Sequence, residues 1–279
     1  DNTATSSGSG GSSGGGGVCN QQGTFEMSGG EIKNNKASSG YGGGVNNTTS
    51  SKNNPAKFTM SGGSITGNST GTGTGGGGVN NYYSEFTMSG AAAIDNNTAC
   101  GGGGVDNFQG TFNMNGGEIK NNISSGGNGG GVCNKRTYDS TNTVFNMSAG
   151  TISGNSTTIS GGGVYNGGSA TFNMSGGEII GNTSGSGSSG GGVYNGYGIF
   201  TVSGNVKVID NVRDGTITNG TLDGGTINNV YLSSLSPITV ESGKSLSADA
   251  SIGVSGSLNQ TVVTGTTDTT GFFSDKEEY

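Results

Sequence analysis

The chain has 279 residues, of which 63 are glycine and only 27% are hydrophobic, and it contains no histidine or tryptophan. The formal net charge is −7, from 11 basic and 18 acidic residues, which excludes the basic surface that nucleic-acid binding needs. No apolar run approaches the roughly 20 residues of a membrane-spanning helix, so membrane insertion is not expected. No secretion signal opens the chain, so a secreted form would be a mature or excised fragment.

Residues 1–14 are rich in Ser and Gly and are expected to be a flexible lead-in. Between residues 15 and 213 one unit recurs in steps of 26 to 34 residues. It begins with Gly-Gly-Gly-Val and continues with an Asn two residues after the Val, a Phe-x-Met triplet, an Ile, and a second Asn three residues after the Ile. The valines are Val18, Val45, Val79, Val105, Val132, Val164 and Val193.

Self-similarity at this period indicates a repeat architecture. Phe and Met are two residues apart, which places both on one face of a strand. The segments are short, are separated by Gly, Ser and Asn, and lack a helical period. Three short strands in each unit would form one coil, and like residues of successive coils would stack at roughly 4.8 Å. The sequence therefore predicts an all-β, right-handed, single-stranded parallel β-helix of about seven regular coils.

The two asparagines of each unit follow an inward apolar residue, where the chain must turn a corner. Asn tolerates left-handed backbone, and its amide can bond to the copies above and below. We expect two inward asparagine ladders, although Asn is also simply a good turn residue. The first ladder would contain Asn20, Asn47, Asn81, Asn107, Asn134, Asn166 and Asn195, and the second Asn35, Asn68, Asn97, Asn122, Asn155, Asn182 and Asn211.

After residue 213 the pattern changes, and glycine gives way to Leu and Val. Residues 214–265 are predicted to form divergent closing coils and a cap, because the ends of a solenoid need covering. Residues 266–279 are charged and are expected to be a linker or the end of a fragment.

A row of glycines precedes each Val. The Gly directly before the Val is expected to face outward, leaving a smooth strip on the surface, and the one before it to face inward. Exposed tyrosines beside such a strip would suit contact with carbohydrate or protein, although ordinary packing between coils explains them equally well. The contact candidates are Tyr165, Tyr194, Tyr197, Tyr82 and Tyr83.

Catalysis by a β-helix that acts on carbohydrates would need two carboxylates about 5–9.5 Å apart. The predicted register places Asp95 beside Glu118 and Lys120, and Glu118 two coils from Glu178. We favour a solvated face over an active site here. The absence of histidine excludes Ser-His-Asp triads, and no metal site or cofactor motif is expected. Cys19 and Cys133 share a register but lie four coils apart, roughly 19 Å, which is too far for a disulfide.

The unit reads GGGVYNGGSATFNMSGGEIIGN at 161–182 and GGGVNNTTSSKNNPAKFTMSGGSITGN at 42–68. In this form it resembles the β-helix repeats of large bacterial surface proteins. It is similar to polymorphic outer-membrane adhesin repeats and to pectin-lyase-like repeats, with Val in the small-residue slot and Met after Phe. The tail at 229–255 resembles segments that close such arrays in gut-type Gram-positive bacteria.

The resemblance implies a non-enzymatic stalk or adhesin module on the outside of a bacterial cell, touching a glycan or a surface protein of a host or neighbouring cell. Lateral association of such tubes is left open. The alternative is a carbohydrate-active β-helix of the lyase or glycosidase type, built on Asp95, Glu118 and Glu178. Ice binding is a weaker option, because the outward row between Phe and Met is an irregular mixture of Glu, Thr and Asn.

Overall fold

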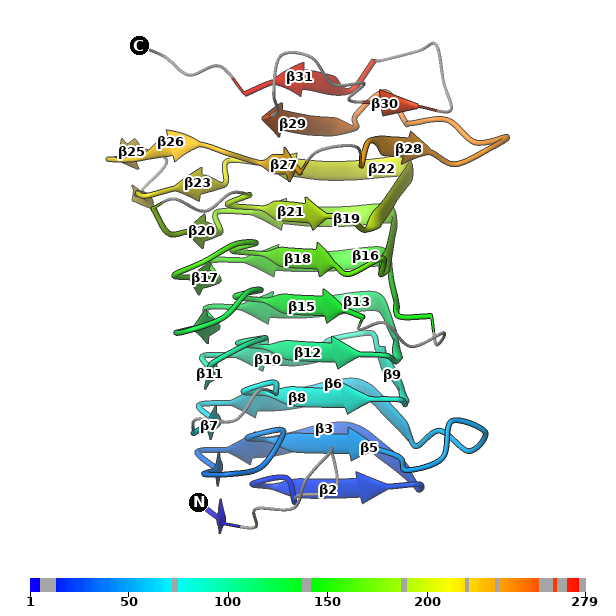
Figure 1. The fold of residues 1–279 in the computed structure, drawn as a ribbon, viewed down its shortest axis with the longest axis vertical. Helices are drawn as coiled ribbons and strands as arrows, with labels where there is room; N and C mark the ends of the chain where they lie inside the picture. Colours follow the sequence, from blue (N-terminus) through cyan, green and yellow to red (C-terminus); the bar gives the residue numbers. More distant parts are fainter. Residues whose placement is uncertain are drawn as a thin grey trace.

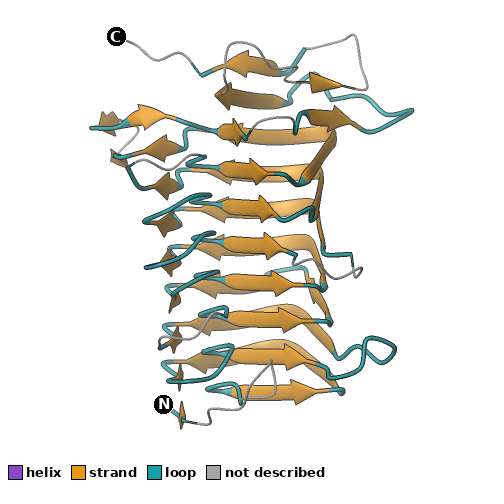
Figure 2. Ribbon diagram, in the orientation of Figure 1, coloured by secondary structure: helices purple, strands orange, loops and turns teal. Residues whose placement is uncertain are grey.

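The computed structural model describes residues 1–5, 14–71, 75–136, 142–186, 190–218, 221–233, 236–255, 263–264 and 270–275. Over these residues the chain is all β, with strands, turns and loops and no helix. The strands pair in parallel from coil to coil and wind into a right-handed tube (Figure 1), with the two termini at opposite ends (Figure 2). The predicted parallel β-helix is confirmed.

Each regular coil has three strands. The first is a four-residue valine strand: β2 (Val18–Gln21), β5 (Val45–Thr48), β8 (Val79–Tyr82), β12 (Val105–Phe108), β15 (Val132–Lys135), β18 (Val164–Gly167) and β21 (Val193–Gly196). The second is a long strand: β3 (Thr24–Lys33), β6 (Lys57–Thr66), β13 (Thr111–Lys120), β16 (Val144–Ser153), β19 (Thr171–Ile180) and β22 (Ile199–Ile209), interrupted in one coil as β9 (Glu85–Met88) and β10 (Ala93–Asp95). The third has two residues: β1 (Thr3–Ala4), β4 (Lys36–Ala37), β7 (Ser69–Thr70), β11 (Thr98–Ala99), β14 (Ile123–Ser124), β17 (Ser156–Thr157), β20 (Thr183–Ser184), β23 (Val212–Arg213) and β26 (Thr226–Ile227).

The long strand bends in the middle, so that one strand supplies two walls of the tube. The bend falls where the coil-to-coil register shifts, between Met114 and Glu118 in β13. Gly117 has φ of +85° there, a conformation that only glycine adopts without strain. Phe112 on one side of the bend and Ile119 on the other are both fully buried, so the bend lets one segment fill two parts of the core.

The core consists of vertical ladders of identical side chains. Phe25, Phe58, Phe86, Phe112, Phe145, Phe172 and Phe200 stack with ring centroids 4.7 to 5.0 Å apart and interplanar angles of 2 to 16°. The Val, Met and Ile positions pair in the same register. Because one coil buries few apolar groups and cannot stand alone, these ladders make the coils depend on their neighbours for stability.

Both asparagine ladders are present. In the first, each Nδ2 donates to the Oδ1 of the next coil at 2.8 Å. In the second, both the backbone N–H and Nδ2 donate to the Oδ1 of the next coil, at 2.9 to 3.0 Å between Asn35 and Asn211. Every bond from one ladder Asn to the next runs toward the C-terminal end, so the two ladders have the same direction.

The second ladder is longer than the sequence predicted. At the N-terminal end, Asn2 donates through its backbone N–H and its Nδ2 to Asn35 Oδ1, at 3.0 and 3.1 Å. At the other end, Asn211 donates to Asn229, and Asn229 donates to both carboxylate oxygens of Asp275 at 2.7 Å. A carboxylate only accepts hydrogen bonds, so Asp275 ends a ladder in which every member donates upward.

Replacing Asp275 with Ala should destabilise the C-terminal closing strands by about 2 kcal/mol, because buried donors lose their acceptor. Three hydrogen bonds disappear, two from Asn229 and one of 2.7 Å from Ser255 Oγ. Asp275→Asn keeps one acceptor oxygen and should lose less. Hydrogen exchange of residues 251–255 and 272–274 measures the effect, and unchanged protection in Asp275→Ala would contradict it.

The glycines before each Val are not an exposed strip, so that prediction is wrong. A Cβ on Gly104 would lie 3.0 Å from Ile119 Cγ2, inside the tube, and a Cβ on Gly103 would lie 2.6 Å from the backbone carbon of Ile123. Gly102, Gly103 and Gly104 are all buried. The segment runs so close to the two-residue strands that there is no space for a side chain.

The C-terminal closure consists of β24 (Thr216–Thr218), β25 (Thr221–Asp223), β27 (Val230–Leu232), β28 (Ile238–Val240), β29 (Ser251–Ser255), β30 (Val263–Thr264) and β31 (Phe272–Ser274). β24 and β25 pair antiparallel, as do β23 and β26, so this part of the predicted closing coils departs from the coil pattern. β1 falls within the predicted lead-in and β31 within the predicted linker, and both join the parallel sheets. Residues 6–13 and 276–279 lie outside the described residues.

Candidate functional site

The second residues of the valine strands form a vertical row on the outer face of their sheet. The row contains Cys19, Asn46, Asn80, Asp106, Cys133, Tyr165, Tyr194 and Tyr231, paired in that order. Its middle is covered, with Asn46 and Asn80 0% exposed and Asp106 and Cys133 2% exposed. The loop before each Gly-Gly-Val lies over it, since a Cβ on Gly102 would lie 2.9 Å from Asp106 Cβ. The accessible part of this face therefore consists of the tyrosines of the row and of the column of residues beside it.

That neighbouring column contains the fourth residues of the valine strands. Tyr82 stacks on Phe108 with ring centroids 5.5 Å apart and an interplanar angle of 3°. Tyr83 meets Tyr82 edge-on at 4.6 Å, and Lys52 Nζ lies 5.1 Å from the centroid of the Tyr83 ring. On the next coil, Lys135 Nζ lies 5.8 Å from the centroid of the Phe108 ring. Three aromatic rings thus lie between two lysine head groups along one side of the column.

In the next two coils, the fourth residue of the valine strand is a glycine. Gly167 pairs with Lys135, and a Cβ on Gly167 would lie 2.4 Å from the Tyr165 ring. A Cβ on Gly196 would lie equally close to the Tyr194 ring. The two tyrosines therefore lean along their strands and occupy the places that the glycines leave empty. They continue the line of Tyr82, Phe108 and Lys135.

The tyrosine rings stack along the tube. Tyr165 and Tyr194 have ring centroids 5.4 Å apart, and Tyr194 and Tyr231 5.8 Å apart, all nearly parallel. We call the continuous set the aromatic band; its residues are Tyr82, Tyr83, Phe108, Lys135, Tyr165, Tyr194 and Tyr231. Tyr197 lies beside its C-terminal part and is 69% exposed. The structure thus joins four of the five predicted tyrosines in one band with Tyr197 at its side.

Three members of the band were missed by sequence reasoning. Tyr231 has a signal, because Val230-Tyr231 repeats the Val-Tyr pairs at 164–165 and 193–194. Phe108 and Lys135 occupy a position that also holds Thr48, Tyr82 and two glycines. No pattern in the sequence distinguishes that column, so only the structure identifies it.

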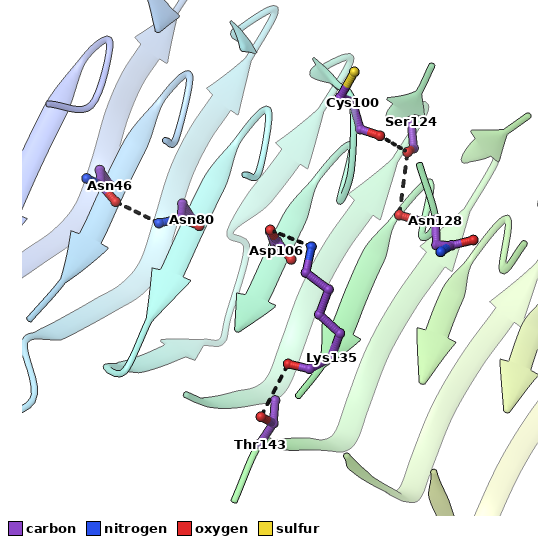
Figure 3. Close-up of polar contacts among 8 residues, drawn as sticks. All are labelled: Asn46, Asn80, Cys100, Asp106, Ser124, Asn128, Lys135 and Thr143. Atoms are coloured by element: carbon purple, nitrogen blue, oxygen red, sulfur yellow. Dashed lines mark hydrogen bonds and ion pairs between the residues drawn. The ribbon is translucent and has the colours of Figure 1, made fainter. Parts of the chain in front are cut away.

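A buried ion pair lies where the band and the covered row meet. Lys135 Nζ donates to Asp106 Oδ2 at 3.2 Å, and the Asp106 side chain is 3% exposed (Figure 3). Burial alone would lower the pKa of Lys135, but the attraction of Asp106 outweighs it and holds that pKa above its ordinary value. In the same row Asn80 Nδ2 donates to Asn46 Oδ1 at 2.8 Å. Lys135 therefore stays charged and fixes the middle of the band.

The phenol groups of Tyr165 and Tyr194 keep their protons at physiological pH. Burial raises the pKa of Tyr165, with smaller contributions from Cys133 and Tyr194. Burial also raises the pKa of Tyr194, against a hydrogen bond with Ser233 that lowers it. Both phenols are therefore neutral at physiological pH and offer O–H donors to a partner.

The cysteines differ in access. Cys133 is buried, and burial raises the pKa of its thiol to about 12, while Cys19 is exposed and Cys100 is intermediate. All three are free thiols. Ser124 Oγ donates to the backbone oxygens of Cys100 and Asn128 at 3.2 and 3.4 Å (Figure 3).

We expect iodoacetamide to alkylate Cys19 in the native protein at neutral pH while Cys133 stays unmodified, because the thiolate is the reacting form and Cys133 is both covered and protonated. Peptide mass spectrometry of each cysteine over time measures this. Denaturant should equalise the two rates. Native labelling of Cys133 as fast as Cys19 would contradict the burial of the covered row.

The predicted carboxylates lie on another wall of the tube. Asp95 pairs in register with Lys120, and Glu118 with Ala93. Glu118 and Glu178 flank Thr151 on either side, two coils apart as predicted. Glu118 accepts a hydrogen bond from Lys120 at 2.5 Å, and Glu178 one from Lys207 at 3.0 Å. Each glutamate of the predicted set thus has a lysine as its partner.

A shallow hollow of about 430 Å³ lies beside Glu118. It arises where the long strand is interrupted between β9 and β10, and small residues from Gly90 to Ala93 line it. Glu118 is the one carboxylate in its lining, and Thr151 faces it from the next coil. The hollow can admit a small polar ligand, with a single carboxylate at its edge.

Among the described residues, no group of three or more His, Cys, Asp or Glu side chains could hold a metal ion. The described part of the chain also has no helix with the length and apolar character needed to cross a bilayer.

A scan against protein-family models, a search of the curated proteins and a search of the solved structures found no match to this chain.

Proposed function

We propose that this chain is a non-enzymatic segment of a bacterial extracellular surface protein: a stiff solenoid that presents the aromatic band as a contact face. The aromatic band carries the proposal. Identical side chains fill the interior, whereas the outer columns of the valine sheet change from coil to coil and gather five tyrosines and one phenylalanine around one lysine. Aromatic residues of this kind are enriched at protein contact surfaces.

The stacking determines which partner suits the band. Because Tyr165, Tyr194 and Tyr231 stack on one another, their ring faces are largely covered, which leaves ring edges and hydroxyls for a partner. Such a row suits hydrogen bonding to a glycan or a polypeptide rather than the stacking of sugar rings on single aromatic faces. Tyr197, which is 69% exposed, would supply a free ring. The partner class is therefore a glycan or a surface protein of a host or neighbouring cell.

The alternative function is that of a carbohydrate-active β-helix, and the hollow beside Glu118 is the observation that favours it. A glycosidase would need a second carboxylate about 5–9.5 Å away. Asp95, one coil away, and Glu178, two coils away, are the candidates on the same wall. The ion pairs of Glu118 with Lys120 and Glu178 with Lys207 would have to open for either glutamate to act as an acid or nucleophile.

The deciding experiment screens the purified chain on a glycan array and on intact bacterial and epithelial cells, and assays product release on the same polysaccharides. Binding without release would support the contact face. Release that is lost in Glu118→Gln would overturn it in favour of the enzyme, and no binding to any array or cell would overturn it as well.

Once a ligand is found, Tyr197→Ala is expected to weaken binding at least tenfold, about 1.4 kcal/mol. Tyr165→Phe keeps the stacked ring and removes only the hydroxyl, so it should also weaken binding without changing Tm. Tyr83→Ala tests the far end of the band. Affinity that is unchanged in all of these variants would contradict a contact through the band.

A further inference from the structure

The N-terminal end of the tube has an incomplete edge. In the described residues, β2 pairs only with β5, and β3 only with β6. Val18, Phe25 and Ile32 of this first coil are only partly buried, whereas their counterparts in the next coil are 0 or 1% exposed. Apolar ladders that are closed elsewhere in the tube therefore meet solvent at this end.

A hollow of about 310 Å³ lies at this edge. Its lining combines Gly17, Val18 and Ile32 with the polar residues Asp1, Asn2, Glu31, Lys33 and Asn35. Val18, Ile32, Asn2 and Asn35 are ladder positions of the repeat, so the hollow opens onto the end of the core, with the exposed Glu31 and Lys33 at its edge. An occupant must present apolar groups to Val18 and Ile32 and polar groups to the asparagine ladder.

Part of a preceding coil is already in place. Asn2 makes the same two bonds to Asn35 that each ladder Asn makes to the next. Thr3 and Ala4 pair in parallel with Lys36 and Ala37, as the other two-residue strands pair. Residues 1–4 thus hold the last positions of a coil whose valine and long strands would lie over the hollow.

The direction of the ladders restricts the occupant. Each Asn donates toward the C-terminal end, so a coil below the first must donate upward. The N-terminal end of a second copy would place acceptor against acceptor. The C-terminal end of a second copy finishes its second ladder in the Asp275 carboxylate, which cannot donate. A coil of the same repeat in the same direction supplies the donors that this edge needs.

We propose that the N-terminal end of the tube is a docking surface for one further coil of the same repeat, carried in cis ahead of Asp1. Its inward Val, Phe, Met and Ile would continue the ladders, and its first Asn would donate to Asn20. Asp1 lines the hollow, so a chain that leads into Asn2 from the long strand of that coil has a direct path. This inference does not depend on what the aromatic band binds.

The test fuses a copy of residues 102–120 directly ahead of Asp1, so that Asp1 and Asn2 take the places of Asn121 and Asn122 in the unit. The control fusion carries Phe112→Ser and Ile119→Ser in the copied segment only, so it has the same length but cannot stack. Tm, hydrogen exchange of residues 18–33 and the alkylation rate of Cys19 are compared, with Cys133 as the buried internal standard.

The first fusion should raise Tm by several degrees, protect β2 and β3 from exchange and slow the alkylation of Cys19, and the control should change none of these. Equal values in the two fusions would overturn the proposal. Light scattering of the unfused chain should give a monomer. A dimer in which Cys19 is protected would overturn the assignment in favour of a second copy.

Discussion

Replacing Asn155 with Ala is expected to lower the free energy of unfolding by about 3–6 kcal/mol, because two or three buried polar groups are left without partners. Asn155 Oδ1 accepts from the backbone N–H and the Nδ2 of Asn122 at 3.0 and 2.9 Å. Its own Nδ2 donates to the Ile119 oxygen and to Asn182 Oδ1, both at 2.9 Å. Urea denaturation, followed by circular dichroism, measures the loss.

Asn146→Ala is the matched control for this prediction. Asn146 belongs to β16 in the same coil as Asn155, and it forms its own ladder with Asn113 and Asn173 at 2.9 Å. That ladder is on the outer face and is only partly buried, so water can replace the lost bonds. Its loss should stay within about 0.5 kcal/mol. Equal losses in the two variants would mean that burial of the inner ladder is not what makes it stabilising.

Phe145→Ala should cost about 3–5 kcal/mol, the range for removing a large aromatic ring from a closed core. The ring is fully buried and stacks on Phe112 and Phe172 at 4.8 and 4.7 Å. The backbone on both sides is fixed by pairing with neighbouring coils, so the cavity cannot collapse. The same urea titration gives the value.

Val144→Ala controls for the strand itself, because Val144 is the neighbour of Phe145 in β16 and points outward. Its loss should be within about 0.5 kcal/mol. A cost below about 1 kcal/mol for Phe145→Ala would contradict the rigid core, since it is far under the range for a cavity that stays open.

The interior could be predicted from the sequence because each ladder corresponds to one residue type that recurs at a fixed position of the repeat. Phe112, Met114 and Ile119 recur at fixed spacing, and a spacing of two in a strand determines which side chains share a face. The asparagine corners follow for the same reason. The physical basis is that a position sealed between two identical coils tolerates very few side chains.

The outer face was harder to predict because its columns are not repeated. Phe108, Lys135 and Gly167 share one column and have nothing in common as residues. The leaning of Tyr165 over Gly167 depends on the absence of a Cβ two residues further along the same strand. The sequence also misled about Gly104, because alternation counted from Val105 does not hold where the backbone turns into the loop.

The two ends of the second ladder were not predicted from the sequence, for a different reason. Asn229 and Asp275 are 46 residues apart in the chain, and Asp275 is not an Asn at all. Its role depends on the acceptor-only chemistry of a carboxylate at the last rung. Asn2 lies within residues 1–14, whose Ser- and Gly-rich composition predicts a flexible lead-in and not a rung of the ladder.

The arrangement of the termini has a mechanical consequence. The N-terminus and C-terminus lie at opposite ends of the stack (Figure 1), so tension applied through them runs along the tube and pulls coils apart at their edges. Hydrogen bonds between coils then open a few at a time, starting at an end, instead of resisting together. Each coil that peels away would release roughly 90 Å of extended chain. Such a tube lengthens in steps under load and leaves the remaining coils, with the ladders inside them, intact.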